Sequence, residues 1–149
     1  MTEASAVPSK PFASWIQRLG ALIIDLLPIV AVGILLTVLF GEKETTDTSF
    51  SVELSGGGAA LLYLAQFGWF IYNWVLKQGR TGQTLGKKQL GIAVYQGGTT
   101  TPLGPGMTFV RQLAHILDSF CLIGYLFPLW DKEKRTFADM IMGSRVYQV

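Results

Sequence analysis

The sequence is poor in the residues that most often carry chemistry. Its 149 residues include one cysteine, Cys121, and one histidine, His115. A single cysteine excludes an internal disulfide, and its apolar surroundings predict a small buried side chain. One histidine without an acid cluster at ligand spacing gives no support for a metal or other cofactor. No nucleophile–base pair is recognisable, so we expect a protein that is not an enzyme.

Charge is also scarce. Only 15% of the residues are charged, 50% are hydrophobic, and the net charge is +2. This composition lies far from that of a soluble domain of similar length and is typical of a membrane protein. The slight positive charge is too small to indicate nucleic acid as a partner. We therefore expect the lipid bilayer to be the principal surroundings of this chain.

The first long apolar run extends from Trp15 to Phe40 and contains two charged residues, Arg18 and Asp25. About 20 apolar residues in a helix suffice to cross a bilayer, so this run predicts a transmembrane helix. Ser14 and Gln17 have the spacing of a capping box that would begin it. Arg18 and Asp25 are two helical turns apart and share a face. A carboxylate at this depth costs about 2.5–3.5 kcal/mol on insertion scales, so Asp25 should face protein, a partner or water.

A second apolar run, Ala59–Leu76, predicts a second transmembrane helix. Within it Gln66, Trp69 and Asn73 recur at helical spacing and form one polar and aromatic stripe. Such side chains hydrogen-bond between helices in a membrane, or they line a path for a substrate. The acidic and glycine-rich segment before this run, residues 41–58, is expected to be a surface loop.

The segment after the second run, Lys77–Val94, carries four basic residues and no acid. Basic loops favour the cytoplasmic side, so we expect this segment and the N-terminus to be cytoplasmic, in a multi-pass protein of the plasma membrane. Gly82–Lys87 resembles a phosphate-binding loop, but it is one residue short and Lys88 replaces the required Ser or Thr, so we expect no nucleotide. The alternation of Leu90–Val94 before a glycine turn predicts a short cytoplasmic β-ribbon.

A third apolar segment, Met107–Trp130, has two possible arrangements. Its first half places Arg111, His115 and Asp118 on one face, which is typical of an amphipathic helix at the membrane interface. Only Ser119–Trp130 is free of charge, and about a dozen residues are too few to cross. The segment either lies at the interface and re-enters, or spans. His115 is either a proton-relay group or a hydrogen-bonded interfacial side chain, and with Asp118 it could line a path or contact another helix.

Three motifs in order resemble the RDD family of membrane proteins, named for one arginine and two aspartates. Arg18 followed by Asp25 matches the first, and Gly82–Val94 matches the middle threonine–glycine–lysine run. Lys134–Val146, which contains Asp139, matches the C-terminal signature. The resemblance covers roughly residues 11 to 148. One departure is Ser144-Arg145, where many members have threonine and an apolar residue. It implies transport of unidentified ligands, with sodium–proton exchange proposed for some members.

We therefore expect an all-α membrane protein with two transmembrane helices, a third apolar helical segment and a short cytoplasmic β-ribbon. Residues 1–13 should be a disordered lead-in to an RDD-type transmembrane domain, residues 14–149. Arg18, Asp25 and Asp139 are expected to form one cluster near the cytoplasmic interface. As a cation or proton site it would serve transport; as a clasp it would serve an accessory subunit that assists a larger membrane complex. Three helical segments make a thin wall, so transport would require a homo-oligomer.

Overall fold

The computed structural model describes residues 10–149, except for the side chain of Cys121. The expected disordered lead-in, residues 1–13, therefore lies mostly outside the described residues and stays a prediction there. The expected burial of the Cys121 side chain likewise lies outside what the structure describes.

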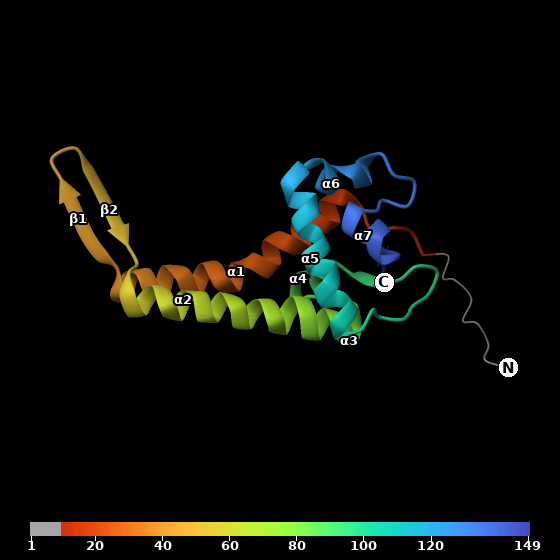
Figure 1. The fold of residues 1–149 in the computed structure, drawn as a ribbon, viewed down its shortest axis with the longest axis horizontal. Helices are drawn as coiled ribbons and strands as arrows, with labels where there is room; N and C mark the ends of the chain where they lie inside the picture. Colours follow the sequence, from red (N-terminus) through yellow and green to blue (C-terminus); the bar gives the residue numbers. More distant parts are fainter. Residues whose placement is uncertain (1–9) are drawn as a thin grey trace. The chain divides into compact units, whose positions relative to one another are not determined.

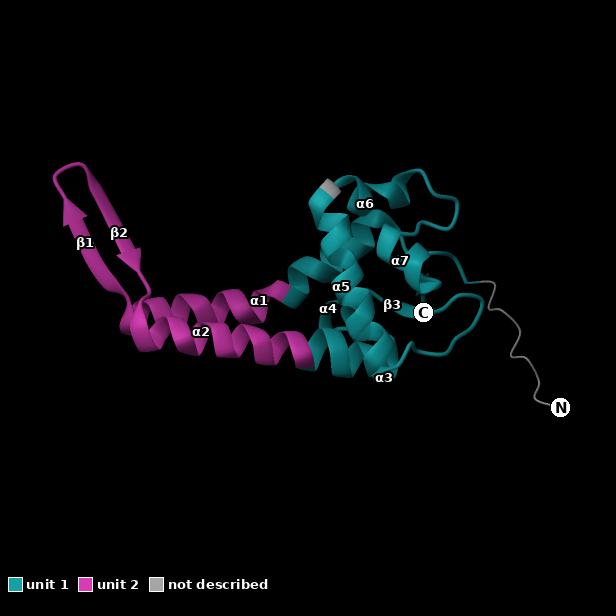
Figure 2. Cartoon of the chain, viewed as in Figure 1, with its two compact units in different colours: residues 1–25, 72–149 teal, residues 26–71 magenta. Residues whose placement is uncertain are grey.

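The chain divides into two compact units, coloured separately in Figure 2. The first unit consists of Met1–Asp25 together with Tyr72–Val149, and the second unit is Leu26–Ile71. Arg18, Asp25, Lys87, Arg111 and Asp139 all belong to the first unit, so this unit carries the candidate site.

Helix α1 (Trp15–Phe40) is continuous over 26 residues (Figure 1). It begins with the predicted capping box: Ser14 N–H donates to Gln17 Oε1 at 2.9 Å, and Gln17 N–H donates to Ser14 Oγ at 3.2 Å. At about 1.5 Å per residue the helix is roughly 39 Å long, more than the ~30 Å hydrocarbon core. Its length and apolar composition suit a membrane span, as predicted.

The second span-length helix is built from three consecutive pieces: α2 (Gly56–Trp69), a π-helix η1 (Phe70–Lys77) and α3 (Gln78–Thr81). Together they form a second apolar stretch of 26 residues that suits a membrane crossing. The expected span is confirmed, and its helix extends beyond the predicted limits at both ends. Because π-turns are rare and often occur at functional sites, η1 is a candidate position for functional residues.

The residues between the two long helices are exposed, as expected of a surface segment, but they form a β-hairpin where a loop was predicted. Strand β1 (Glu42–Thr46) pairs antiparallel with β2 (Ser49–Glu53), and every residue of both is exposed. The two-residue connection Asp47-Thr48 lacks the Asn-Gly or Asp-Gly signal that identifies such hairpins from sequence.

The third apolar segment is broken. Helix α5 (Pro105–Cys121) ends at Leu122, which has φ +52°, and is followed by α6 (Ile123–Leu126) and the 3-10 turn η2 (Phe127–Leu129). The helices before and after the break differ in direction by 104°. Such a bend is compatible with a broken span and with a re-entrant segment, the two arrangements expected.

A small antiparallel sheet forms the centre of the first unit. Strand β3 (Ile92–Gln96) pairs with β4 (Ser144–Gln148), with Val94 opposite Val146. The prediction of a β-strand at Leu90–Val94 is therefore confirmed by β3. The strand that pairs with β3 is the C-terminal β4 and not a neighbouring strand of a hairpin. The hydrophobic core of the unit includes strand residues Ile92, Val94 and Val146 together with Ala13, Ala21 and Leu103. Short helices α4 (Leu85–Gln89) and α7 (Phe137–Met142) complete the unit.

Candidate functional site

The candidate site is centred on Asp139, in the first turn of α7. Thr136 caps this helix, because its side chain accepts from Asp139 N–H at 3.2 Å while Thr136 N–H donates to Asp139 Oδ2 at 3.3 Å. This reciprocal capping box holds the carboxylate against the start of its own helix. Asp139 has no exposed surface, so its charge must be balanced by neighbouring groups.

Two arginines balance that charge. Arg18 Nη1 lies 2.6 Å from Asp139 Oδ2, and Arg111 donates to Oδ1 from Nε at 3.0 Å and from Nη2 at 2.7 Å. Ser144 Oγ also donates to Oδ1, at 2.9 Å. Burial by itself would raise the pKa of Asp139, but the guanidiniums of Arg111 and Arg18 hold it well below its usual range. Asp139 is therefore a permanent anion at neutral pH.

Asp25 makes its hydrogen bonds to a different part of the first unit. Its Oδ1 accepts from Asn73 Nδ2 at 2.8 Å and from Gly86 N–H at 2.7 Å. Asn73 Oδ1 in turn accepts from Leu85 N–H at 2.8 Å. The carboxylate thus lies at the positive N-terminal end of α4, where a negative charge is stabilised. In the segment that resembles a phosphate-binding loop, the N–H groups of Leu85 and Gly86 thus donate to the protein's own side chains.

Gly86 is required for this arrangement. A Cβ at this position would lie 2.0 Å from the backbone oxygen of Ala21, which no side chain tolerates. The absence of a side chain allows α4 to approach α1 closely enough for the Asp25 hydrogen bond. The glycine in the middle motif is therefore explained by packing.

Lys87 follows Gly86 and brings a third cation to the site. Its Nζ donates to the neutral Gln78 Oε1 at 2.7 Å, and no ion pair to Lys87 occurs among the described residues. Burial, together with the charges of Arg111 and Arg18, lowers the pKa of Lys87 from 10.5 to about 7. The carboxylates of the site oppose this shift but do not cancel it.

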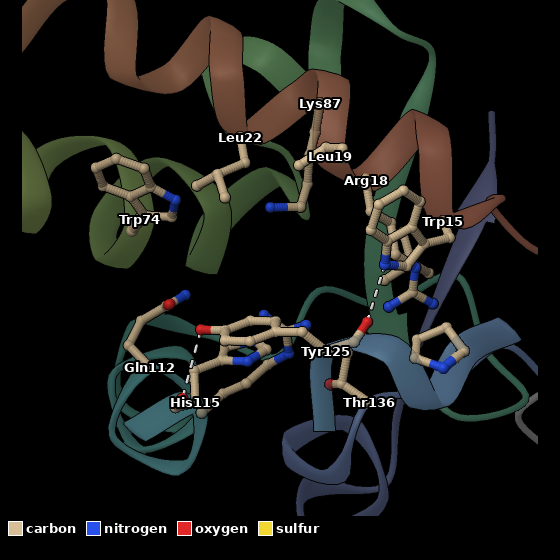
Figure 3. A pocket seen from close by; sticks show the side chains of 13 residues that line it. Trp15, Arg18, Leu19, Leu22, Trp74, Lys87, Gln112, His115, Tyr125 and Thr136 are labelled. Atoms are coloured by element: carbon tan, nitrogen blue, oxygen red, sulfur yellow. Dashed lines mark hydrogen bonds between the residues drawn. The ribbon is translucent and has the colours of Figure 1, made fainter. Parts of the chain in front are cut away.

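A cavity of about 260 Å³ lies beside these residues within the first unit (Figure 3). In Figure 3 Lys87 and Gln112 extend into it from opposite walls. None of its described lining residues is acidic. Its cationic members are Arg18, Lys87 and Arg111, and its larger apolar members are Trp15, Leu19, Leu22, Trp74 and Tyr125.

One wall of the cavity is fixed by His115 and Asp118. His115 Nδ1 lies 2.6 Å from Asp118 Oδ2, and the Tyr125 ring stacks on the imidazole with 5.7 Å between centroids. Asp118 also accepts from the N–H groups of Phe137 and Ala138, at 3.1 and 3.4 Å, and so caps α7. His115 lines the cavity, whereas Asp118 is fully buried behind it.

The structure groups the predicted residues in an unexpected way. Arg18 and Asp139 are in direct contact, whereas the hydrogen bonds recorded for Asp25 go to Asn73 and α4. Gln66 is exposed and belongs to the second unit, so it lines no part of the cavity, unlike its predicted companion Asn73, which is buried in the first.

Sequence reasoning missed Arg111, Lys87 and Gln112 as site residues. Arg111 stood out as a charge within an apolar segment, on the same helical face as His115 and Asp118, and this signal could have identified it. Because Arg111 is a second arginine on Asp139, the expected cluster of Arg18, Asp25 and Asp139 has no surplus of negative charge for a cation. The described residues that line the cavity include the cationic side chains Arg18, Lys87 and Arg111 and no acidic one.

Two apolar helices of span length, the first of which carries Arg18 of the buried arginine–aspartate cluster, define the class as a helical membrane protein. The sequence model of the RDD family matches residues 12–143, and the chain belongs to the RDD family.

Relatives in mycobacteria carry a similar segment. The chain is 33% identical to a "Proline-rich antigen" of Mycobacterium leprae (strain TN) over 154 residues, which is 93% of this chain and 62% of the relative. It is also 33% identical to a "Proline-rich antigen homolog" of Mycobacterium tuberculosis (strain ATCC 25618 / H37Rv), covering 93% of this chain and 64% of the relative. The chain thus spans less than two thirds of these relatives. No solved structure matches it.

Proposed function

We propose that this protein binds a small ligand in the cavity of the first unit and transports it, without catalysing a reaction. The observation that carries this proposal is the cavity itself, about 260 Å³ in volume and lined by cationic and aromatic side chains. A concave site with an apolar wall and a few convergent polar groups is typical of ligand binding. Arg18, Arg111 and His115 are engaged in ion pairs with buried aspartates, which supports a binding role over a catalytic one.

Cation exchange is less well supported than ligand binding. Asp139 is paired with two arginines, which hold its pKa low, so it is a poor site for a proton that must come and go. Arg18, Arg111 and Lys87 would also repel sodium at this place. We therefore assign Arg18 and Asp139 the role of holding the cavity wall, with Asp25 anchoring α4.

Membrane insertion and assembly are part of the same proposal. Two or three spans are too few to enclose a conduit, so transport requires several copies of this chain or a larger membrane complex. The basic residues after the second span favour a cytoplasmic first unit and N-terminus, in the plasma membrane. The acidic hairpin would then be outside.

Native mass spectrometry of protein purified from membranes in mild detergent tests ligand binding. Wild-type protein should retain a small-molecule adduct, and Leu22→Trp, which fills the cavity, should lose it. Leu27→Trp is the matched control, because Leu27 is 58% exposed and does not line the cavity. Equal adducts in wild type and Leu22→Trp, or none in either, would contradict the proposal.

The accessory role remains a second candidate, favoured by the purely structural contacts of the signature residues. It predicts a stoichiometric protein partner after crosslinking in native membranes and no retained small molecule. Transport by this chain alone predicts only copies of itself in the crosslinked product.

A further inference from the structure

The polar side of the cavity has unused hydrogen-bond donors. Arg18 Nε and Gln112 Nε2 are both buried and have no hydrogen-bond partner among the described residues. Both atoms are donors that cannot accept, and both residues line the cavity. Leaving such groups unpaired costs about 1–3 kcal/mol each, so a ligand rich in acceptor oxygens would be stabilised here.

The charge balance indicates the same type of ligand. Asp139 neutralises one of its two arginines, and Lys87 is bonded to a neutral amide. No acidic residue is among the described lining residues. A phosphate or carboxylate group would therefore meet cationic side chains and several donors at once, with no acidic side chain on the described wall.

The opposite side of the cavity is apolar and continues onto an exposed apolar surface. Leu19 and Leu22 line the cavity and are still 39% and 43% exposed. Both lie within the first eight residues of α1, at most about 11 Å from its start. In a membrane this is the depth at which lipid headgroups meet the acyl chains, where Trp15 and Tyr125 also suit the interface.

Resting on the proposed function, we propose that the ligand is a phospholipid with an anionic phosphodiester headgroup, which enters the cavity while the acyl chains stay in the bilayer. The cavity volume, about 260 Å³, is below the ~300–1,000 Å³ of sites that enclose a whole drug-sized molecule. It has room for a headgroup and not for a whole lipid. A free phosphate shares the headgroup chemistry but leaves the apolar wall unused.

Lys87 makes binding dependent on pH. The groups that face it are Arg18 and Asp25 from α1, Arg111 from α5 and Asp139 from α7. A bound anion favours protonated Lys87, so affinity should be constant below about pH 7 and should fall as the pH rises above it. A phosphodiester carries one negative charge both below and above pH 7. A change in affinity with pH would therefore come from the protein.

The test measures binding to the purified full-length chain in neutral maltoside detergent by titration calorimetry. The probes are dioctanoyl phosphatidylglycerol, dioctanoyl phosphatidylcholine, and glycerophosphoglycerol, which is the same anionic headgroup without chains. We expect phosphatidylglycerol to bind at least about tenfold more tightly than either of the others. Lys87→Met should remove about tenfold or more of that affinity, the loss of one charge-assisted hydrogen bond.

Two further variants keep the result interpretable. Lys88→Met removes the adjacent exposed lysine, which does not line the cavity, and should leave affinity unchanged. Lys87→Arg should retain the preference for phosphatidylglycerol and lose the decline above pH 7, because arginine stays protonated. Thermal unfolding of each variant confirms that it is folded.

Equal binding of the two lipids, or a preference that survives Lys87→Met, would overturn the inference. Glycerophosphoglycerol binding as tightly as phosphatidylglycerol would also overturn it, in favour of a soluble anion. These outcomes are separable from failure of the proposed function, because another adduct lost in Leu22→Trp would still show that the cavity binds a ligand.

Discussion

Arg18 and Asp139 are 121 positions apart in the sequence, yet Nη1 of the arginine lies 2.6 Å from Oδ2 of the aspartate. Arg111 contacts the other carboxylate oxygen, so one buried aspartate links α1, α5 and α7. This clasp fixes the wall of the cavity, and it accounts for the arginine and one aspartate of the RDD signature.

Arg18→Ala and Arg111→Ala should each lower the free energy of unfolding by about 3–5 kcal/mol, because each leaves a buried charge with one partner fewer. Arg135→Ala is the control, since its pairs with Asp131 and Glu133 are partly exposed and worth about 0–1 kcal/mol. Thermal or denaturant unfolding in detergent measures the difference. A loss no greater than that of Arg135→Ala would argue against the clasp.

Gly86→Ala should abolish most folded protein, because the new methyl group would meet the Ala21 backbone oxygen. Gly106→Ala is a suitable control: it lies in α5 with nothing within 4 Å of the added Cβ, and alanine favours a helix. Yield of monodisperse protein by size-exclusion chromatography reports the outcome. Normal yield from Gly86→Ala would mean that α1 and α4 do not approach as described.

Asp25→Ala should destabilise the protein more than Asp25→Asn. Alanine removes the acceptor used by Asn73 Nδ2 and Gly86 N–H, at about 1–3 kcal/mol for each donor left unpaired. Asparagine keeps an oxygen that can accept from them. Hydrogen exchange at the Gly86 amide should be fast in the alanine variant and slow in the asparagine variant; equal exchange would contradict the assignment.

Lys87→Met should stabilise the protein at about pH 6 and have little effect at about pH 10. Folding lowers the pKa of Lys87 from 10.5 to about 7, so folding disfavours the protonated side chain. This destabilisation is full below pH 7, shrinks as the pH rises and is lost above 10.5. Melting temperatures at both pH values, with Lys88→Met as control, test the sign. If Lys87→Met changed the melting temperature equally at both pH values, the lowered pKa of Lys87 would be refuted.

Membrane sidedness can be tested by cysteine labelling in intact cells, in a Cys121→Ser background. Thr46 and Lys88 are exposed and suit substitution by cysteine. An impermeant reagent should label Thr46→Cys and leave Lys88→Cys unlabelled until the membrane is opened. The reverse pattern would invert the proposed orientation.

Much of the fold was predictable because it depends on local patterns. Run length and composition identified both span-length helices, and the Ser14–Gln17 spacing identified the first helix start. The pairing of β3 with β4 was not predictable, since strands of five residues carry little information about a distant partner.

The site was predictable only in part, for a similar reason. The family motifs pointed to Arg18 and Asp139, but no pattern in the sequence showed that Arg111 would approach Asp139 from a third helix. That one contact removes the surplus of negative charge that Arg18, Asp25 and Asp139 alone would have, and with it the case for a bound cation. Asn73 of the predicted stripe contacts Asp25 of the first long helix, as expected, whereas Gln66 is exposed, because helical spacing alone does not show where a helix enters a packed core.

Sodium–proton flux in proteoliposomes tests the central claim most directly, namely that the signature residues build a ligand cavity and do not exchange cations. Vesicles holding the wild-type protein should show no pH- or sodium-dependent flux above protein-free vesicles, while a known antiporter reconstituted in parallel does. Asp25→Asn should leave this background unchanged. Wild-type flux that disappears in a normally folded Asp25→Asn variant would contradict the account and make Asp25 part of a working ion site.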